Sequence, residues 1–227
     1  MAVKYADEII VLSKGVQSYF WENYRRKTIF IPNGVNKAEK QKTNEIVRKF
    51  GLVKNDYILY VGRLVPEKGL VYLIRAFKMI HTTKKLVIAG GASDTNEFED
   101  ELRKLATGDE RIIFTGFVQG KVLEELYSNA YIYVLPSDLE GMPLSLLEAM
   151  SYGNCCLVSD IEECSAVVEE NAIIFRRGDI SDLKDKLQMA IDSENLVNKI
   201  GSVSAEFICN KYNWDDITKK TIDLYYQ

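Results

Sequence analysis

Residues 131–152 read YIYVLPSDLEGMPLSLLEAMSY, and this stretch is the clearest guide to the fold. It opens with an apolar run, Tyr131–Leu135, whose composition is typical of a strand that is buried on both faces. A polar loop follows, and Pro143–Tyr152 then has the pattern of a helix. We expect Pro143 at the first helical position, because the N–H group that proline lacks would have no partner there. The stretch therefore predicts a strand, a loop and a helix in succession.

The same alternation of strand and helix continues on both sides of this stretch. Further apolar runs predict strands at Tyr57–Val61, Leu86–Ala89, Arg111–Phe114, Cys155–Ser159 and Ala172–Phe175. Helical patterns predict helices at Lys68–Ile80, Asn96–Ala106, Lys121–Ala130 and Ser181–Ile191, the last with Ser181 as its cap. This alternation predicts an α/β fold, a doubly wound Rossmann-like parallel sheet of about six strands. Ligands of such sheets bind at the carboxyl ends of the strands, so the loops there hold the candidate site.

The two ends of the chain have a different organisation. Residues 1–35 read as strand, helix and strand, with segments at Ala6–Leu12, Lys14–Tyr24 and Thr28–Pro32. These strands have no sheet of their own to join, so we expect residues 1–35 to be the last part of a preceding domain. A charged linker with a short helix covers residues 36–56, the main domain spans residues 57–210, and an amphipathic helix lies within residues 211–227.

Composition and charge exclude several classes of protein. Hydrophobic residues make up 47% of the 227 residues and charged residues 27%, which is ordinary for a soluble globular protein. The formal net charge of −4 argues against general nucleic-acid binding, which needs a basic surface. No apolar run approaches the roughly 18 residues that span a bilayer, and Met1–Asp7 lacks the pattern of a signal peptide.

The cysteines and the single histidine point away from metal and nucleophilic chemistry. The four cysteines include no C-x-x-C pair, so we expect no disulfide framework, and a reducing cytoplasm suits the chain. Neither a His/Cys cluster nor a D-x-D pair is present to bind a metal. His81 ends a predicted helix, where a surface role suits it better than a place in a catalytic triad.

The loop and helix start within SDLEGMPLSLLE, residues 137–148, form the first candidate site. The N–H groups of Leu144 and Ser145 are expected to be free at the helix start, which makes an anion site of the phosphate-binding kind. Glu140 and Glu148 could hold a sugar and a ribose on either side of a diphosphate, because carboxylates accept hydrogen bonds from hydroxyls. Alternatively, Glu148 offsets the helix dipole and Glu140 is solvated. The strand, the loop, Gly141 and the spacing together favour binding.

The second candidate site is GRLVPEKG, residues 62–69, which follows the first strand of the main domain. Arg63 and Lys68 can neutralise a diphosphate there. They could instead be surface charges, but cations at a helix start oppose its dipole, which favours an anionic partner. The order G-x-x-x-x-G-K-[ST] is absent, so ATP hydrolysis by a P-loop loses support. Gly90-Gly91 and residues 116–118 could also let a ligand approach the backbone, although turns explain them equally well.

These motifs occur together with others in a fixed order along the chain. They are ADEIIVLS at 6–13, IPNGVN at 31–36, VGRLVPEKG at 61–69, LVIAGG at 86–91, FTGFV at 114–118, LPSDLEGMPLSLLEAMSYG at 135–153 and VSD at 158–160. In this combination the sequence resembles the retaining glycosyltransferases of family 4, whose GT-B fold consists of two Rossmann-like halves. The resemblance implies that residues 57–210 are the C-terminal, nucleotide-sugar-binding half and that residues 211–227 form the cross-over helix.

The resemblance also implies roles for individual residues. The catalytic group would be Arg63, Lys68 and Glu140, of which the two cations bind the donor diphosphate and the glutamate binds hydroxyls of the donor sugar. Further donor-binding residues would be Gly62, Val118, Gly141, Met142, Pro143, Leu144 and Glu148. In this set Val118 lies beside the base, the backbone amides at Gly141–Leu144 surround sugar and phosphate, and Glu148 binds the ribose.

The implied reaction moves a hexose-type sugar from a UDP-, GDP- or ADP-linked donor to a saccharide or lipid acceptor, with retention of configuration. It implies no bound metal and no other cofactor. Polysaccharide biosynthesis in the cytoplasm, with peripheral association of the full enzyme at the inner face of the cell membrane, is the expected setting. The nucleotide, the sugar, the acceptor and the oligomeric state stay open.

The chain departs from the family pattern at several points. Asn154 stands where many relatives have proline, and Ile161-Glu162-Glu163 replaces the x-P-E of S-D-x-P-E, which changes the expected shape of the loop at 160–166. Residues 1–35 would be the end of the acceptor-binding half, so we expect the chain to be incomplete without the rest of that half and inactive alone. A non-catalytic nucleotide-sugar-binding subunit of a split enzyme is the alternative, and a GT-B epimerase is a more distant one.

Overall fold

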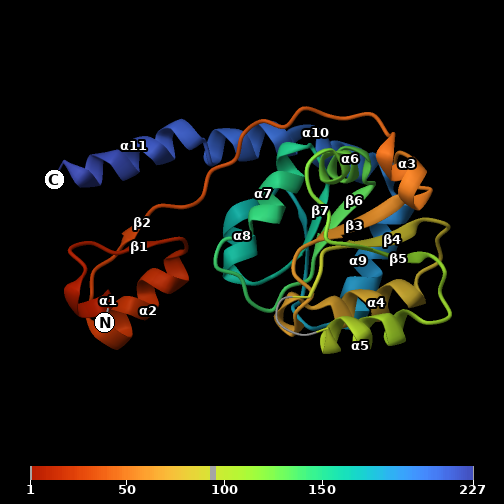
Figure 1. The fold of residues 1–227 in the computed structure, drawn as a ribbon, viewed down its shortest axis with the longest axis horizontal. Coiled ribbons are helices and arrows are strands. Elements are labelled where there is room, and N and C mark those ends of the chain that lie inside the picture. The colour runs from red at the N-terminus through yellow and green to blue at the C-terminus, as the bar shows by residue number, and fades with distance from the viewer. Residues whose placement is uncertain (1, 93–95, 227) are drawn as a thin grey trace.

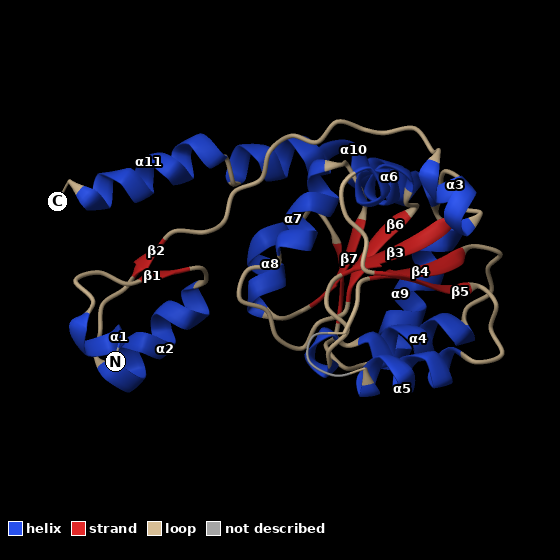
Figure 2. Ribbon diagram, viewed as in Figure 1, coloured by secondary structure: helices blue, strands red, loops and turns tan. Residues whose placement is uncertain are grey.

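The computed structural model describes residues 2–92 and 96–226, and its centre is an open six-stranded parallel sheet (Figures 1 and 2). Its strands are β3 (Tyr57–Val61), β4 (Lys85–Ala89), β5 (Ile112–Gly116), β6 (Ile132–Leu135), β7 (Cys156–Ser159) and β8 (Ile173–Phe175). Their order across the sheet is β5-β4-β3-β6-β7-β8, and all neighbours are parallel. The predicted fold class is therefore confirmed.

Helices cover both faces of this sheet, as Figure 2 shows. On one face α4 (Leu70–Met79) packs against α5 (Glu97–Ala106) and α9 (Ile180–Asp192). On the other face α3 (Glu45–Phe50) packs against α6 (Lys121–Asn129), and α7 (Leu144–Ser151) packs against α10 (Glu194–Lys211). The central strands β3, β6 and β7 are almost entirely buried between these layers, which explains their continuous apolar composition.

The direction in which the strands are added reverses between β3 and β6, which are neighbours in the sheet. From β3 the chain proceeds outwards through β4 to β5, and from β6 it proceeds the other way through β7 to β8. The connections that leave β3 and β6 therefore turn to opposite faces of the sheet (Figure 2). This topology places a crevice at the carboxyl ends of these strands. Open α/β sheets bind their ligands at such a point.

The helix boundaries correct several details of the sequence analysis. A short 3₁₀ turn, η1 (Pro66–Lys68), precedes α4, so the helix begins at Leu70 rather than at Lys68. The first residue of α7 is Leu144, and Pro143 is its N-cap, with a ψ of 89° that is not helical. Ser181 does not cap α9: Asp179 is the N-cap, and its carboxylate accepts the Asp182 N–H at 3.0 Å. The helix α8 (Glu162–Val168) and the helix α10 were not predicted.

The N-terminal residues form a small unit beside the main domain. The strands β1 (Ile10–Val11) and β2 (Ile29–Phe30) form a separate two-stranded parallel sheet, joined by α2 (Lys14–Tyr24). The strand–helix–strand pattern is thus present, but the strands are shorter than predicted and do have a sheet, and α1 (Ala2–Tyr5) precedes them. The last helix, α11 (Trp214–Tyr225), extends along this unit (Figure 1). The predicted end of that helix at Gln227 lies outside the described residues.

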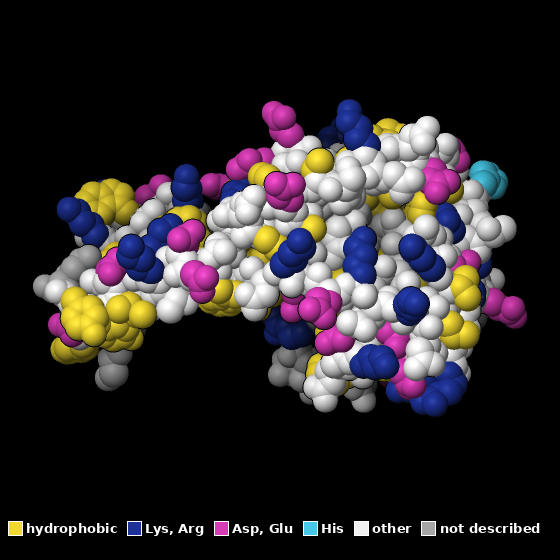
Figure 3. All heavy atoms as spheres, turned by 90° about the horizontal axis from the view of Figure 1, so that it is seen from above, with side chains coloured by type: hydrophobic (Ala, Val, Ile, Leu, Met, Phe, Trp, Pro, Cys, Tyr) yellow, Lys and Arg dark blue, Asp and Glu magenta, His cyan; other side chains and the backbone are white. Residues whose placement is uncertain are grey.

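Hydrophobic side chains gather on the surface at the end of the molecule that this unit and α11 form (Figure 3). Large exposed apolar side chains on α1, α2 and α11 include Tyr5, Tyr19, Trp21, Tyr24 and Tyr225. None of the helices in the described residues combines the length and apolar character needed to cross a bilayer. All four cysteines are free.

The linker between the small unit and the sheet is held by a buried glutamate, Glu125 of α6. Its Oε2 atom accepts hydrogen bonds from the backbone N–H groups of Asn44, at 2.9 Å, and Ile46, at 3.1 Å. The side chain of Asn44, the N-cap residue of α3, makes no capping bond. A residue from another helix therefore supplies the cap of α3 and ties the linker to the main domain.

Replacing Glu125 with alanine should destabilise the chain, because both amide groups would lose a charged acceptor in a buried place. We expect the free energy of unfolding to fall by about 1.5–3 kcal/mol or more, the range for hydrogen bonds to charged groups. Urea unfolding followed by circular dichroism measures this. Glu101→Gln, an exposed change on α5, is the control and should have little effect. An unchanged midpoint in Glu125→Ala would contradict the assigned role.

Candidate functional site

The site lies where the loop after β3, residues 62–69, meets the loop after β6, residues 136–143; we call them the basic loop and the acidic loop. Backbone contact joins them, since the Asp138 N–H donates to the Glu67 carbonyl at 2.8 Å. Gly69 packs so closely that an added Cβ would lie 2.0 Å from the Pro136 carbonyl oxygen. Its φ of +67° also favours glycine. The close packing of the loops therefore depends on Gly69.

An ion pair joins the same loops at their functional residues. Lys68 Nζ lies 2.6 Å from Glu140 Oε1, and the side chains are only 15% and 7% exposed. Ser137 Oγ donates a hydrogen bond to the same carboxylate oxygen at 2.7 Å. Ser159 Oγ, at the end of β7, donates to the Ser137 carbonyl at 2.6 Å. Glu140 is thus held from two sides, and the alternative that it is a solvated surface residue is wrong.

Glu148 lies within α7 and faces a buried tyrosine. Tyr127 of α6 donates its hydroxyl hydrogen to Glu148 Oε2 at 3.0 Å. Burial raises the pKa of Glu148, and the hydrogen bond from Tyr127 lowers it by less. The first turn of α7 contains no acidic residue, so offsetting the helix dipole is not the role of Glu148. The carboxylate is held by Tyr127 and lines a cavity, where hydroxyl groups of a ligand can reach it.

The start of α7 has the free amide groups that the sequence analysis expects. The Pro143 carbonyl accepts the N–H groups of Leu146, at 3.0 Å, and Leu147, at 3.2 Å. Among the described residues, the N–H groups of Leu144 and Ser145 have no acceptor. Tyr133 donates to Ser145 Oγ at 2.8 Å and fixes this turn from below. The helix start can therefore hydrogen-bond an anion.

Two adjoining cavities contain several of the candidate residues, although neither is lined by Lys68 or Glu140. A cavity of about 480 Å³ is lined by Gly62, Arg63, Gly90, Phe117, Val118 and Leu123, among others. A second, of about 510 Å³, is lined by Glu148, Tyr127, Tyr152, Leu123 and part of the linker. Leu123 lines both, so the cavity that contains Val118 adjoins the one that contains Glu148. Gly90 is explained by packing as well as by its turn, since an added Cβ would lie 1.8 Å from the Gly62 carbonyl oxygen.

Gly141 and Met142 face a third cavity, of about 420 Å³, towards the N-terminal unit. Its other walls include Ser13 and Lys14, at the start of α2, and Glu162 and Glu163, at the start of α8. The acidic loop therefore lies between the crevice of the sheet and the small unit. Among the described residues, no group of three or more His, Cys, Asp and Glu side chains is placed to hold a metal ion.

The departures from the family pattern have structural explanations. Asn154 is buried, and its Nδ2 atom donates to the carbonyls of Tyr127 and Ala149, both at 2.9 Å. Proline has no side-chain donor to make these bonds, which tie the end of α7 to α6. Ile161 is the N-cap residue of α8, and Glu162 and Glu163 occupy its first turn, where acidic side chains suit the helix dipole.

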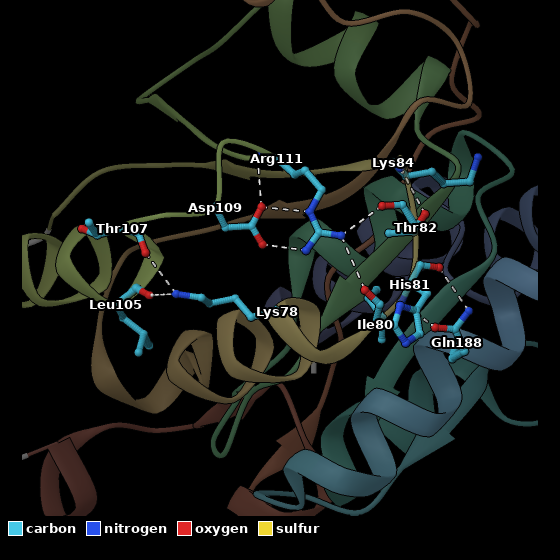
Figure 4. Close-up of polar contacts among 10 residues, drawn as sticks. All are labelled: Lys78, Ile80, His81, Thr82, Lys84, Leu105, Thr107, Asp109, Arg111 and Gln188. Carbon is cyan, nitrogen blue, oxygen red and sulfur yellow. Dashed lines mark hydrogen bonds and ion pairs between the residues drawn. The ribbon is translucent and has the colours of Figure 1, made fainter.

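His81 lies away from this site, in a polar cluster that Figure 4 shows. It is exposed, and its backbone N–H donates to Gln188 Oε1 at 2.9 Å. Beside it Arg111 pairs with Asp109 at 2.6 Å, which holds the pKa of Asp109 below its ordinary value, and donates to the Thr82 carbonyl. These groups join the end of α4 to the start of β5, at the amino edge of the sheet. The surface role expected for His81 agrees with this position.

Several residues of the site were not singled out from the sequence. Ser137 and Ser159 belong to the motifs at 135–153 and 158–160. Nothing in their spacing indicates that the Ser159 hydroxyl bonds to the Ser137 backbone. Tyr72 donates to Asp138 Oδ2 at 2.9 Å, and Tyr127 reaches Glu148 across 21 positions of sequence. Both tyrosines lie on amphipathic helices, where aromatic residues usually belong to the core.

Comparison with known proteins supports one family. The model of the family described as glycosyl transferases group 1 matches residues 42–207. An uncharacterized glycosyltransferase of Methanocaldococcus jannaschii is 29% identical over 96% of this chain and 59% of its own length. O-antigen chain mannosyltransferase B of Escherichia coli is 23% identical over 79% of this chain and 48% of its own length. The chain thus spans about half to three-fifths of the length of these relatives.

Solved structures give the same result for the fold. Sucrose-phosphate synthase of Thermosynechococcus elongatus superposes with a TM-score of 0.84 at 26% identity, covering 99% of this chain and 59% of that one. HepE of Anabaena, in complex with UDP and glucose, superposes with a TM-score of 0.90 at 20% identity, covering 99% and 64%. With the family match across most of its length, the chain belongs to the glycosyl transferases group 1, and its six-stranded sheet is a Rossmann-like half of the GT-B fold.

Proposed function

We propose that this chain is the donor-binding domain of a retaining glycosyltransferase that moves a hexose from a nucleoside-diphosphate sugar to a saccharide or lipid acceptor. The observation that carries the proposal is the convergence of Lys68, Glu140 and the free amides of α7 at the point where the strand order reverses. A cation and a helix start bind phosphate oxygens, and a carboxylate accepts hydroxyl groups. A nucleotide sugar carries both kinds of group.

Each residue of the site is proposed to bind one part of the nucleotide sugar. Arg63 and Lys68 bind the diphosphate, and the amides at the start of α7 receive its oxygens. Glu140 accepts hydroxyls of the sugar and Glu148 those of the ribose, while Val118 and Gly62 line the cavity that takes the base. HepE is described in complex with UDP and with UDP-glucose, so UDP-linked donors are the first to test, followed by GDP- and ADP-linked ones.

The proposed chemistry is stabilisation of the leaving group. As the bond between the sugar and the diphosphate breaks, negative charge grows on the leaving phosphate. Arg63 and Lys68 stabilise that charge, and Lys68 does so from a position held by Glu140, so no bound metal is required in this proposal. The acceptor attacks from the side on which the diphosphate leaves, which retains the configuration of the sugar. Glu140 holds the sugar in place during this step.

We propose that the acceptor half is only partly represented, by residues 1–35. The helix α2, which joins β1 and β2, carries exposed aromatic side chains. The relatives are also longer than this chain. In this proposal residues 36–56 are the linker, residues 57–210 the nucleotide-sugar-binding domain, and residues 211–227 the cross-over helix. A non-catalytic subunit that binds nucleotide sugars for a partner chain is the alternative, and turnover distinguishes the two.

Replacing Lys68 with alanine should weaken the binding of UDP-glucose. Removal of a charge-assisted contact worth about 1.5–3 kcal/mol should raise the dissociation constant about 10-fold to 100-fold. Isothermal titration calorimetry measures this change. Lys104→Ala removes the same charge from an exposed position at the end of α5 and should leave affinity unchanged. Equal affinities for the wild type and Lys68→Ala would disprove the assignment of the phosphate site.

The affinity for UDP-glucose should depend on pH through Glu148. Burial raises the pKa of this carboxyl group. Ribose hydroxyls make stronger hydrogen bonds to its ionised form than to its protonated form. Binding should therefore be complete above the raised pKa and weaken as the pH falls through it. Calorimetry at a series of pH values should show this dependence in the wild type and its loss in Glu148→Gln. The sugar-linked diphosphate does not titrate near neutral pH, so identical profiles for the two proteins would refute the role.

The chain alone should bind donor and yet show negligible transfer. Holding donor and acceptor together can supply roughly 7–11 kcal/mol of barrier reduction, and this half supplies one wall of the cleft. An assay with radiolabelled donor and a panel of lipid and saccharide acceptors tests this expectation. Multiple turnovers at about 1 per second or faster would show that the remaining half is dispensable. Turnover restored by adding an N-terminal half, covalently or as a separate chain, would support the transferase over the non-catalytic subunit.

A further inference from the structure

The ion pair between Lys68 and Glu140 places a negative charge beside the group that would bind phosphate. The two side chains come from different loops, yet Nζ and Oε1 lie 2.6 Å apart with little exposure to solvent. In the proposed function Lys68 binds the diphosphate, so a phosphate oxygen and the Glu140 carboxylate must share the same ammonium group. Its three N–H donors allow sharing, but the two anions then lie close together.

Glu140 is not free to turn away from an incoming phosphate. Ser137, which is fully buried, donates to the carboxylate oxygen that pairs with Lys68, at 2.7 Å. The Ser137 carbonyl is itself held by Ser159, which is also fully buried, at 2.6 Å. The carboxylate is thus fixed in its position by contacts that extend into the core of the sheet. A charge in a partly buried place interacts with its neighbours more strongly than one in water.

The two ligands of the proposed site differ in what they offer to this carboxylate. The sugar of a nucleotide sugar provides hydroxyl donors, which offset the repulsion between Glu140 and the diphosphate. A free nucleoside diphosphate provides no such donor on that side. Its terminal phosphate also carries more negative charge at neutral pH, because the second ionisation of a phosphate monoester has a pKa of about 6. The repulsion between Glu140 and the phosphates is therefore greater for the free nucleoside diphosphate, the product that remains after transfer, than for the nucleotide sugar.

We propose that Glu140, held by Ser137 and paired with Lys68, makes the site discriminate against free nucleoside diphosphate in favour of the sugar-bearing donor. This inference rests on the proposed function and adds to it the direction of two effects. The Glu140 carboxylate strengthens the binding of the donor and weakens the binding of the product. The consequence is faster release of the nucleotide after transfer. A contact made only for recognition of the sugar would leave the affinity for the free nucleotide unchanged.

Glu140→Gln tests this inference, because glutamine keeps the size of the side chain and a hydrogen-bond acceptor and removes the charge. Calorimetry with UDP and with UDP-glucose should show opposite changes. We expect UDP to bind about threefold tighter or more and UDP-glucose to bind about threefold weaker or more. Glu110→Gln makes the same change in net charge at an exposed position before β5, at the opposite edge of the sheet, and should alter neither affinity.

Ser137→Ala is the second variant, and it leaves both charges in place. Without the serine hydroxyl the carboxylate can turn towards solvent, so UDP should again bind tighter, by a smaller factor than in Glu140→Gln. Thermal unfolding of each variant checks that it is folded. Unchanged or weaker UDP binding in both folded variants would overturn the inference while the proposed function stands. If the wild type bound none of UDP, GDP, ADP and their sugars, the proposed function itself would be wrong.

Discussion

The site of this protein depends on the packing of the basic loop against the acidic loop. Gly69 lies against the Pro136 carbonyl so closely that no side chain fits between them, and the Asp138 amide bonds to the Glu67 carbonyl. This contact brings Lys68 within 2.6 Å of Glu140. Because the loops leave neighbouring strands towards opposite faces of the sheet, they meet only at the crevice where the strand order reverses.

Buried hydroxyl groups on the sheet and on α6 fix the positions of α7 and the acidic loop. Tyr133, whose pKa is raised well above its ordinary value by burial, bonds to Ser145 in the first turn of α7, and Tyr127 bonds to Glu148. Ser159 bonds to the backbone of the acidic loop. The polar groups of the site are therefore positioned by rigid elements of the sheet and its helices, which suits the recognition of a ligand with several separate hydrogen-bonding groups.

Most of the fold could be predicted because its signals are local. Continuous apolar runs identified all six strands of the main sheet to within a few residues, since strands covered on both faces need no polar positions. The helices α8 and α10 were missed, and so was the cap of α9, because several polar residues near Asp179 could each serve as a cap. The strands of residues 1–35 were predicted too long, since β1 and β2 pair over only two residues each.

Local sequence patterns were enough to predict the class of fold and the loops that carry the charged residues, because strand composition, glycine and proline act over a few neighbouring positions. Which of those residues meet depends on the tertiary structure. The Lys68–Glu140 pair spans 72 positions, and the bond that joins Glu125 to Ile46 spans 79. Such contacts depend on the order of the strands and on the faces to which their connections turn. No local pattern contains that information, because it arises when distant segments bury their apolar surfaces against each other.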